Sequence, residues 1–354
     1  MFFLEILTSY IVPVIYTSFV SLVLVLFFLF IFRIKDSNIR ILFFFIPLIK
    51  PFIIVSEKID KTYFQPTPTI PIVGLLRFPD PNDIFKIFEG PNIGPSVFSD
   101  INYLILSLVL ISIMVILIIR WALLYLFYRN LAHEDIVGRK DVPEIYAIID
   151  NYIQKIKTKA PYVSLTHRHY FSPFIVGIKN FALVLSPKLM DMLNTGEKEV
   201  LIQHELSHIK RNDNLIGWIA LILRDFLFFN PFSYVAYSLI KSEQEKDSDK
   251  LVVKYTGKPA KEIARNILNA VLKIKSISTS KPISEPAQSF TFSTMSFFSQ
   301  IKFKNRINSI LKTNPEKIYS RIFPKILMCI LFLVLLIIQI MFVIKINNFY
   351  IFLR

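Results

Sequence analysis

The stretch Val200-Leu-Ile-Gln-His-Glu-Leu-Ser-His-Ile-Lys-Arg-Asn-Asp-Asn214 contains two histidines four positions apart, with a glutamate directly after the first. Residues four apart lie on one face of an α-helix, so His204 and His208 can present their ring nitrogens to a single ion. Only five histidines occur in the 354 residues, and two of them lie here. The stretch therefore predicts a helix that binds one zinc ion per chain.

Glu205, between these histidines, indicates what the ion would do. Zinc lowers the pKa of water to about 7 and polarises a carbonyl group, which is the chemistry of peptide-bond hydrolysis. A carboxylate beside the ion can take the proton from that water. We therefore expect Glu205 to be the catalytic general base of a peptidase, because a purely structural zinc site has no need of one.

A catalytic zinc ion usually has three protein ligands, so a third residue is required. The single cysteine, Cys329, lies in an apolar stretch, which leaves the carboxylates of residues 241–249. In a helix Glu245 and Asp249 lie on one face. We expect Glu245 to bind the ion, with Glu243 as the alternative, and Asp249 to hold the far nitrogen of a ligand histidine.

Two short β-rich runs, residues 172–177 and 181–185, precede the zinc motif and predict a hairpin. An exposed edge strand near the metal could bind a substrate as an additional strand, and ordinary core packing is an equal alternative. The candidate substrate-binding residues are Phe174, Val176 and Gly177. Thr195 is the expected N-cap of the motif helix, and residues 142–157 predict an amphipathic helix before the hairpin.

Two other features leave alternatives open. His167 and His169 alternate on a strand-like stretch and could stabilise an oxyanion, but a pair of surface histidines is the simpler interpretation. Residues 276–299 are rich in Ser, Thr and Pro, which predicts a mobile loop. Such a loop could also be a site of self-cleavage or of partner docking.

The composition indicates a bilayer, because 53% of the residues are hydrophobic and only 8 are glycine. A helix of about 20 apolar residues crosses the roughly 30 Å of hydrocarbon. Three blocks reach that length, and a fourth is interrupted by Pro47, Lys50 and Pro51. The expected spans are residues 11–32, 38–56, 101–120 and a C-terminal helix within 322–354. The first lacks the basic start of a signal peptide, so we expect it to be an anchor.

Basic residues beside these spans predict the orientation. With four spans the three main clusters of Lys and Arg fall on one side, although Lys345 and Arg354 fall on the other, whereas residues 56–100 form an acidic outer loop. We therefore expect a multi-pass protein of the cell membrane with both termini outside and a cytoplasmic zinc domain over residues 130–321. We attribute the net charge of +15 to basic residues that lie at the membrane surface, and we expect no nucleic-acid partner.

Residues 215–240 are apolar enough to resemble another span, but one crossing would place Glu245 across the bilayer from His208. Arg224 and Asp225 in the middle, followed by Asn230-Pro231, favour two helices that meet at a bend. We expect a membrane-associated helical hairpin over residues 212–240, which returns Glu245 to the histidines.

These motifs resemble the BlaR/MecR-type membrane metallopeptidases, and the resemblance covers most of the chain. Its strongest part is the zinc motif followed by a basic pair and Asp213. The segments Ser172–Gly177, Phe229–Phe232, Glu245–Asp249, Ile46–Pro51 and Asn305–Ile310 are also similar to that family. The resemblance implies an α-helical membrane protein with about four transmembrane helices and an inserted α+β zincin-type (gluzincin) metallopeptidase domain. It also implies that Asp213 supports the zinc ligands.

Two departures from the family matter. The family often has Ala and Cys where this chain has Asp247 and Ser248, and its antibiotic sensors carry an outer penicillin-binding domain that is not expected here. The resemblance implies a zinc endopeptidase in regulated proteolysis, acting on a protein or peptide such as a transcriptional repressor, or on itself. An HtpX-like quality-control protease is one alternative, and a non-catalytic membrane receptor that retains the zinc fold is another.

Overall fold

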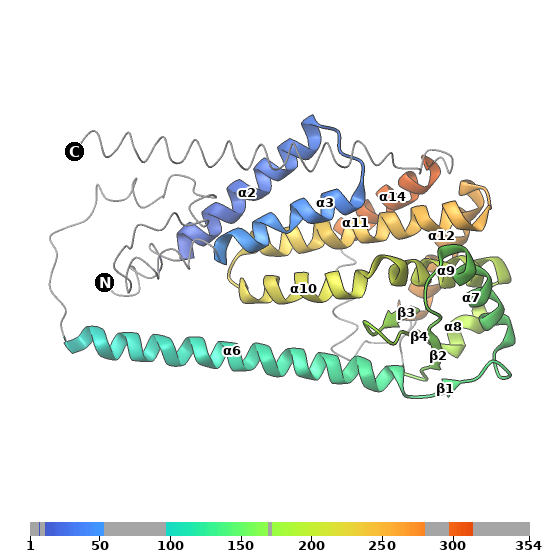
Figure 1. Cartoon of the computed structure of the whole chain (residues 1–354), viewed down its shortest axis with the longest axis horizontal. Coiled ribbons are helices and arrows are strands. Elements are labelled where there is room, and N and C mark those ends of the chain that lie inside the picture. The colour runs from blue at the N-terminus through green and yellow to red at the C-terminus, as the bar shows by residue number, and fades with distance from the viewer. Residues whose placement is uncertain (1–6, 8–10, 53–96, 169–171, 280–296, 314–354) are drawn as a thin grey trace. The chain divides into compact units, whose positions relative to one another are not determined.

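The computed structural model describes residues 7, 11–52, 97–168, 172–279 and 297–313. The expected C-terminal span, most of the outer loop and most of the Ser/Thr/Pro-rich segment lie outside these residues. In chain order the elements are α2 (Val12–Ile31), α3 (Ser37–Phe44), α6 (Val97–Ala132), β1 (Ile136–Val137), α7 (Pro143–Ile156), β2 (Tyr162–Leu165), β3 (Phe174–Val176), β4 (Ala182–Leu185), α8 (Pro187–Met192), α9 (Thr195–Arg211), α10 (Asp213–Phe226), α11 (Pro231–Thr256), α12 (Ala260–Thr279) and α14 (Phe297–Leu311) (Figure 1).

The described residues form two compact units. The first, which we call the apolar unit, contains the residues up to Leu117 together with Ala220–Ile240. The second, which we call the α+β unit, contains Ile118–Ile219 and residues 241–313. The zinc motif and its expected third ligand both belong to the α+β unit, so the candidate site can be described within that unit alone.

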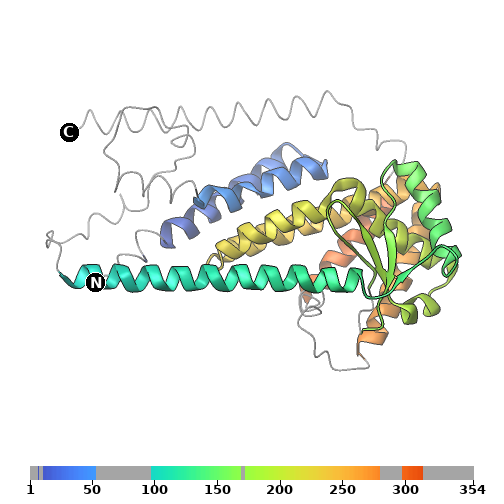
Figure 2. The ribbon, with the colours of Figure 1, turned by 60° about the horizontal axis from the view of Figure 1, so that its bottom comes forward.

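The α+β unit contains a four-stranded sheet in the order β1-β2-β4-β3 (Figure 2). β2 and β4 are parallel, whereas β3 and β4 pair in antiparallel fashion with Ile175 opposite Leu183. The predicted hairpin is therefore confirmed, and β3 is an edge strand. Gly177 has a φ of 101°, and a Cβ atom there would clash with the main-chain oxygen of Asn180. The hairpin turn thus requires glycine at this position.

The core of the α+β unit lies between this sheet and α7, α8, α9 and α12. The predicted amphipathic helix is confirmed as α7, whose buried residues follow a spacing of three and four. Its partners are apolar side chains of the strands and of the zinc-motif helix. The buried residues are Ile145, Ile149, Tyr152, Ile156, Val163, Ile175, Leu183, Leu185, Leu189, Met190, Leu193, Leu201, Ile202, Leu206, Ile209, Ala270 and Ile274.

The zinc-motif helix α9 is fixed at both ends. Asn194 accepts a hydrogen bond from the main-chain nitrogen of Glu197, whose side chain accepts one from the main-chain nitrogen of Asn194. This reciprocal pair is a capping box. The prediction of Thr195 as the cap was therefore wrong by one residue, because Asn194 is the extended residue that precedes the helix and Thr195 is already helical. At the other end Asn212 adopts a left-handed conformation with φ 56°.

Two described helices, α2 and the Ser107–Ala132 part of α6, are long and apolar enough to cross a membrane. α6 is longer than the predicted span 101–120, because its 36 residues continue past Arg120 to Ala132. Large apolar side chains along α6, including Leu108, Ile111 and Ile116, are more than half exposed. Such a surface is stable in a lipid environment and costly in water.

The expected span 38–56 is not one continuous helix among the described residues. α3 ends at Phe44, a turn follows at Phe45, and helical residues resume from 46 to 52. Pro47 explains the break, because its nitrogen cannot donate to the carbonyl oxygen one turn earlier. The count of four spans consequently stays a prediction.

The apolar unit contains the expected bend between α10 and α11. α10 ends at Phe226 and α11 begins at Pro231, where proline is favoured in the first helical turn. The buried Asn230 accepts from the main-chain nitrogen of Phe232 and donates to the Ser18 hydroxyl, which donates to the main-chain oxygen of Pro47. This chain of hydrogen bonds fixes the bend inside an apolar environment.

Candidate metal centre

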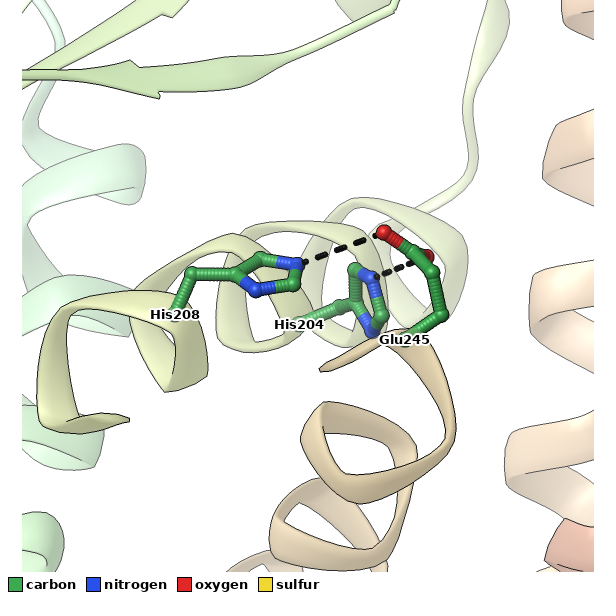
Figure 3. A group of neighbouring side chains, drawn as sticks. All are labelled: His204, His208 and Glu245. Atoms are coloured by element: carbon green, nitrogen blue, oxygen red, sulfur yellow. Dashed lines mark ion pairs between the residues drawn. The ribbon is translucent and has the colours of Figure 1, made fainter. Parts of the chain in front are cut away.

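Three potential metal ligands converge in the α+β unit. The nearest ligand atoms of His204, His208 and Glu245 all lie within 4.8 Å of one another. Nε2 of His204 is 3.3 Å from one carboxylate oxygen of Glu245, and Nε2 of His208 is 3.8 Å from the other. Figure 3 shows both rings turned toward this carboxylate. Two imidazole nitrogens and one carboxylate oxygen are a donor set that zinc prefers.

The opposite nitrogen of each ring faces an acid. Nδ1 of His208 is 2.8 Å from Oδ2 of Asp213 and 3.1 Å from the Ser248 hydroxyl. Nδ1 of His204 is 2.9 Å from Oδ1 of the fully buried Asp249. A carboxylate favours a proton on the nitrogen that it faces, which leaves the lone pair on Nε2. Both rings are therefore oriented to bind an ion on the side where Glu245 lies.

The position of Glu245 follows from the packing of two helices in the α+β unit. The Gln244 side chain donates a hydrogen bond to the main-chain oxygen of Asp213, which joins the second half of α11 to the start of α10. Glu245 and Asp249, four residues apart on α11, then face the same side. Glu243, the alternative ligand, accepts from Lys246 instead and does not belong to the ligand group.

Glu205 follows His204 on α9 and is only partly buried. Burial raises the pKa of its carboxyl group, and the nearby rings of His208 and His204 act in the opposite direction. A raised pKa makes a carboxylate a better proton acceptor. Glu205 is thus both accessible and basic, as a group that receives a proton from water has to be.

The direction of the pKa shifts of the ligands Glu245 and His204 is set by neighbouring groups of opposite charge. Burial alone would raise the pKa of Glu245, but Arg306 and His204 outweigh it and hold that pKa well below its usual range. Burial would also lower the pKa of His204, but Asp249 and Glu245 outweigh it and raise the pKa to about 10. Because a ligand imidazole has to be neutral, metal binding would release this proton.

Several side chains around the ligands were not predicted. Arg306 of α14 contacts Glu245, Asp249 and His204, although it lies 102 positions after His204. From the sequence, Asn305–Ile310 was noted only as resembling the family. No spacing pattern in the sequence indicated a contact between residues 102 positions apart. Arg211 donates to Asp213 and pairs with Asp247. The two positions that depart from the family, Asp247 and Ser248, thus both have partners in the site.

Phe174 and Val176 of the predicted substrate residues lie on β3, an edge strand beside α9, and Gly177 follows that strand in the hairpin turn. Phe174, Val176 and Gly177 are partly buried. The Asn214 side chain donates to the main-chain oxygens of Ile175 and Gly177. A substrate strand would therefore have to pair with other main-chain groups of β3 or displace this amide.

His167 has an exposed side chain 3.8 Å from Asp135 and does not belong to the ligand group, which agrees with a surface position. His169 lies outside the described residues. The structure therefore does not bring His167 to the metal centre.

Two histidines one helical turn apart, a carboxylate from a second helix and an adjacent glutamate define the site of a metallopeptidase. Together with the apolar helices, this site makes the protein a membrane metallopeptidase. A family model described as BlaR1 peptidase M56 matches residues 92–292, which is more than half of the chain. The chain belongs to this family.

Individual relatives match shorter regions. The methicillin resistance mecR1 protein of Staphylococcus aureus is 29% identical over 83 residues, which cover 23% of this chain and 14% of that protein. A protease HtpX homolog of Thermococcus kodakarensis is 34% identical over 87 residues, covering 24% of this chain and 30% of the relative. Another HtpX homolog, from Gemmatimonas aurantiaca, is 25% identical over 173 residues, or 40% and 60% of the two chains. This chain therefore spans less than two thirds of each relative.

We predict that zinc stabilises the protein through this site. An ion that binds only the folded state at a hundred times its Kd adds about 2.7 kcal/mol, which corresponds to a rise in Tm of roughly 5–10 °C for a domain of this size. The rise should be seen on adding zinc to chelator-treated protein in detergent. It should be largely lost in His208→Ala and kept in His133→Ala, which removes an exposed histidine outside the site. Equal stabilisation of both variants would contradict the assignment.

Proposed function

We propose that the chain is a zinc-dependent endopeptidase of the membrane, with His204, His208 and Glu245 as zinc ligands and Glu205 as general base. The observation that carries the proposal is the orientation of the two rings. Each Nδ1 faces a buried acid, and each Nε2 faces Glu245. A chance pair of surface histidines would not be held at both nitrogens.

Bound zinc would supply a positive charge that polarises the scissile carbonyl group and acidifies water. Glu205 accepts the proton of the attacking water and passes it to the leaving nitrogen, so the same carboxylate serves first as base and then as acid. Asp249 and Asp213 keep the ligand rings from rotating during these transfers. Because Glu205 is partly exposed, as are the ligands His208 and Glu245, it lies where a substrate can approach.

The substrate is a protein or peptide, as membership of a peptidase family implies. We assign Phe174 and Val176 on the edge strand β3, and Gly177 directly after it, to substrate binding, because an extended peptide can pair with a sheet edge. Asn214, which holds two main-chain oxygens of this edge, would take part in setting where pairing begins.

Regulated proteolysis is the favoured role, because mecR1, named for methicillin resistance, is among the relatives. A transcriptional repressor or the chain itself is then the substrate. Membrane quality control is the second candidate, favoured by the similarity to HtpX homologs over as much as 40% of the chain. The proteins cleaved in cells that produce this chain would separate the two roles. Cleavage of a single protein would support regulated proteolysis, and cleavage of many misfolded proteins would support quality control.

The α+β unit lies in the cytoplasm in this proposal, with both termini outside and four spans. The grouping of Ala220–Ile240 with α2 in the apolar unit supports a hairpin that lies against the bilayer. We predict that single cysteines placed at 33–40 or 130–142, in a Cys329→Ser background, resist an impermeant label added outside intact cells. Labelling of both segments without permeabilisation would reverse the orientation.

We predict that Glu205→Gln abolishes peptidase activity while zinc binding is retained, because the amide keeps the shape of the side chain but cannot accept the proton. A general base contributes about 10²–10⁴-fold in rate. Cleavage of the chain itself and of an unfolded protein should be compared in liposomes with zinc. Glu262→Gln, at an exposed position of α12, is the matched control and should be fully active. Unchanged cleavage by Glu205→Gln would favour another base, and absence of cleavage by the parent under activating conditions would favour a receptor.

A further inference from the structure

One charged side chain in contact with the metal centre has no part in the proposed mechanism. Arg306 of α14 donates from Nε and Nη2 to the two carboxylate oxygens of Asp249, at 2.7 and 2.9 Å. Its Nη1 lies 2.8 Å from Oε2 of Glu245, and its Nη2 is 3.3 Å from Nε2 of His204. One guanidinium thus touches a ligand histidine, a ligand carboxylate and the acid behind the histidine.

The geometry of these contacts requires arginine. The planar guanidinium fork matches both oxygens of a carboxylate and leaves a further nitrogen for a second acid. A lysine ammonium on a flexible stem could neutralise one carboxylate but could not fix Asp249 and Glu245 together. Asp249 is fully buried, so an uncompensated charge there would be costly.

α14 is held firmly enough to place this group. Ile310 is fully buried, and Phe303 and Ile307 pack against the same apolar cluster. The cluster also contains Val200 of α9, Val252 and Val253 of α11, and Ile263, Ala264 and Ile267 of α12. Arg306 therefore projects from a helix that packs against α12 and shares an apolar cluster with both helices that carry the zinc ligands.

The two ligand histidines have parallel supports. Asp213 contacts His208, and Arg211 in turn contacts Asp213, with its Nε 3.1 Å from Oδ2 of that carboxylate. Asp249 likewise contacts His204, and Arg306 contacts Asp249. The first arginine comes from the zinc-motif helix itself. The second comes from a distant segment, so one half of the centre depends on α14.

We propose that Arg306 is a positioning residue of the metal centre, which fixes the carboxylates of Asp249 and Glu245 and thereby holds His204 and Glu245 in the orientation that binds zinc. This inference rests on the zinc-peptidase function proposed above. The opposing effect is repulsion between the guanidinium and a metal cation. The two effects predict opposite results, since loss of positioning weakens zinc binding and loss of repulsion strengthens it.

The test is the zinc affinity of the full-length protein in detergent, measured by competition with a chromophoric chelator in a Glu205→Gln background. We expect Arg306→Ala to weaken zinc binding about 10–100-fold, the usual effect of removing a group that supports a ligand. Arg306→Lys should lie between Arg306→Ala and the parent. The visible spectrum of the cobalt-substituted protein should change in both variants, because it reports the geometry of the ligands.

Lys304→Ala is the matched control, because it removes one positive charge from an exposed position of the same helix. It should bind zinc like the parent. Asp249→Asn should weaken binding by itself, and adding Arg306→Ala to it should cost less than Arg306→Ala costs in the parent, because part of the arginine's effect passes through Asp249. Arg306→Lys keeps the positive charge beside Asp249, so the zinc affinity of this variant remains informative if Arg306→Ala does not fold.

Parental or tighter zinc binding by Arg306→Ala, parental binding by Arg306→Lys, or full additivity with Asp249→Asn would each overturn the proposal. Failure of the parent to bind zinc at all would instead refute the proposed function. The two failures are therefore distinguishable within one set of measurements.

Discussion

The pairing of each ligand histidine with a buried carboxylate is the interaction on which the rest of the site depends. A free imidazole can carry its proton on either nitrogen and can rotate, so it is a poor ligand until one nitrogen is engaged. Asp213 is hydrogen-bonded to Nδ1 of His208, and Asp249 lies 2.9 Å from Nδ1 of His204. The Nε2 atoms are then directed to the side occupied by Glu245, and the chemistry assigned to Glu205 follows from that arrangement.

This arrangement places acidic and basic side chains at positions with little exposure to solvent. Moving a charged group into the interior costs several kcal/mol even after relaxation, so Asp249 and Asp213 each need a cationic neighbour. Arg306 and Arg211 supply that charge, and the apolar clusters around α7, α9, α12 and α14 supply the packing that keeps these groups together. The centre is therefore preorganised by the residues that surround its ligands.

The parts of the fold and of the candidate site that could be predicted from the sequence are those marked by a short-range spacing of residues. The four-residue separations of His204 from His208 and of Glu245 from Asp249 placed each pair on one helix face, and Asn230-Pro231 indicated the bend between α10 and α11. Arg306 was missed because its contacts span 102 positions and carry no periodic signal. Thr195 was predicted as the cap, one residue too late, because threonine is also a common N-cap residue. Pro47 marked the interruption of the second apolar block, but the sequence did not show that α3 ends at Phe44.

X-ray absorption at the zinc edge of the purified full-length protein tests the central claim most directly. The account predicts a shell of nitrogen and oxygen atoms at about 2.0–2.2 Å, with the outer scattering of two imidazole rings and no sulfur. In His208→Ala one of these ring signals should disappear. A sulfur shell, or two imidazole signals that persist in His208→Ala, would contradict the assignment of the metal centre.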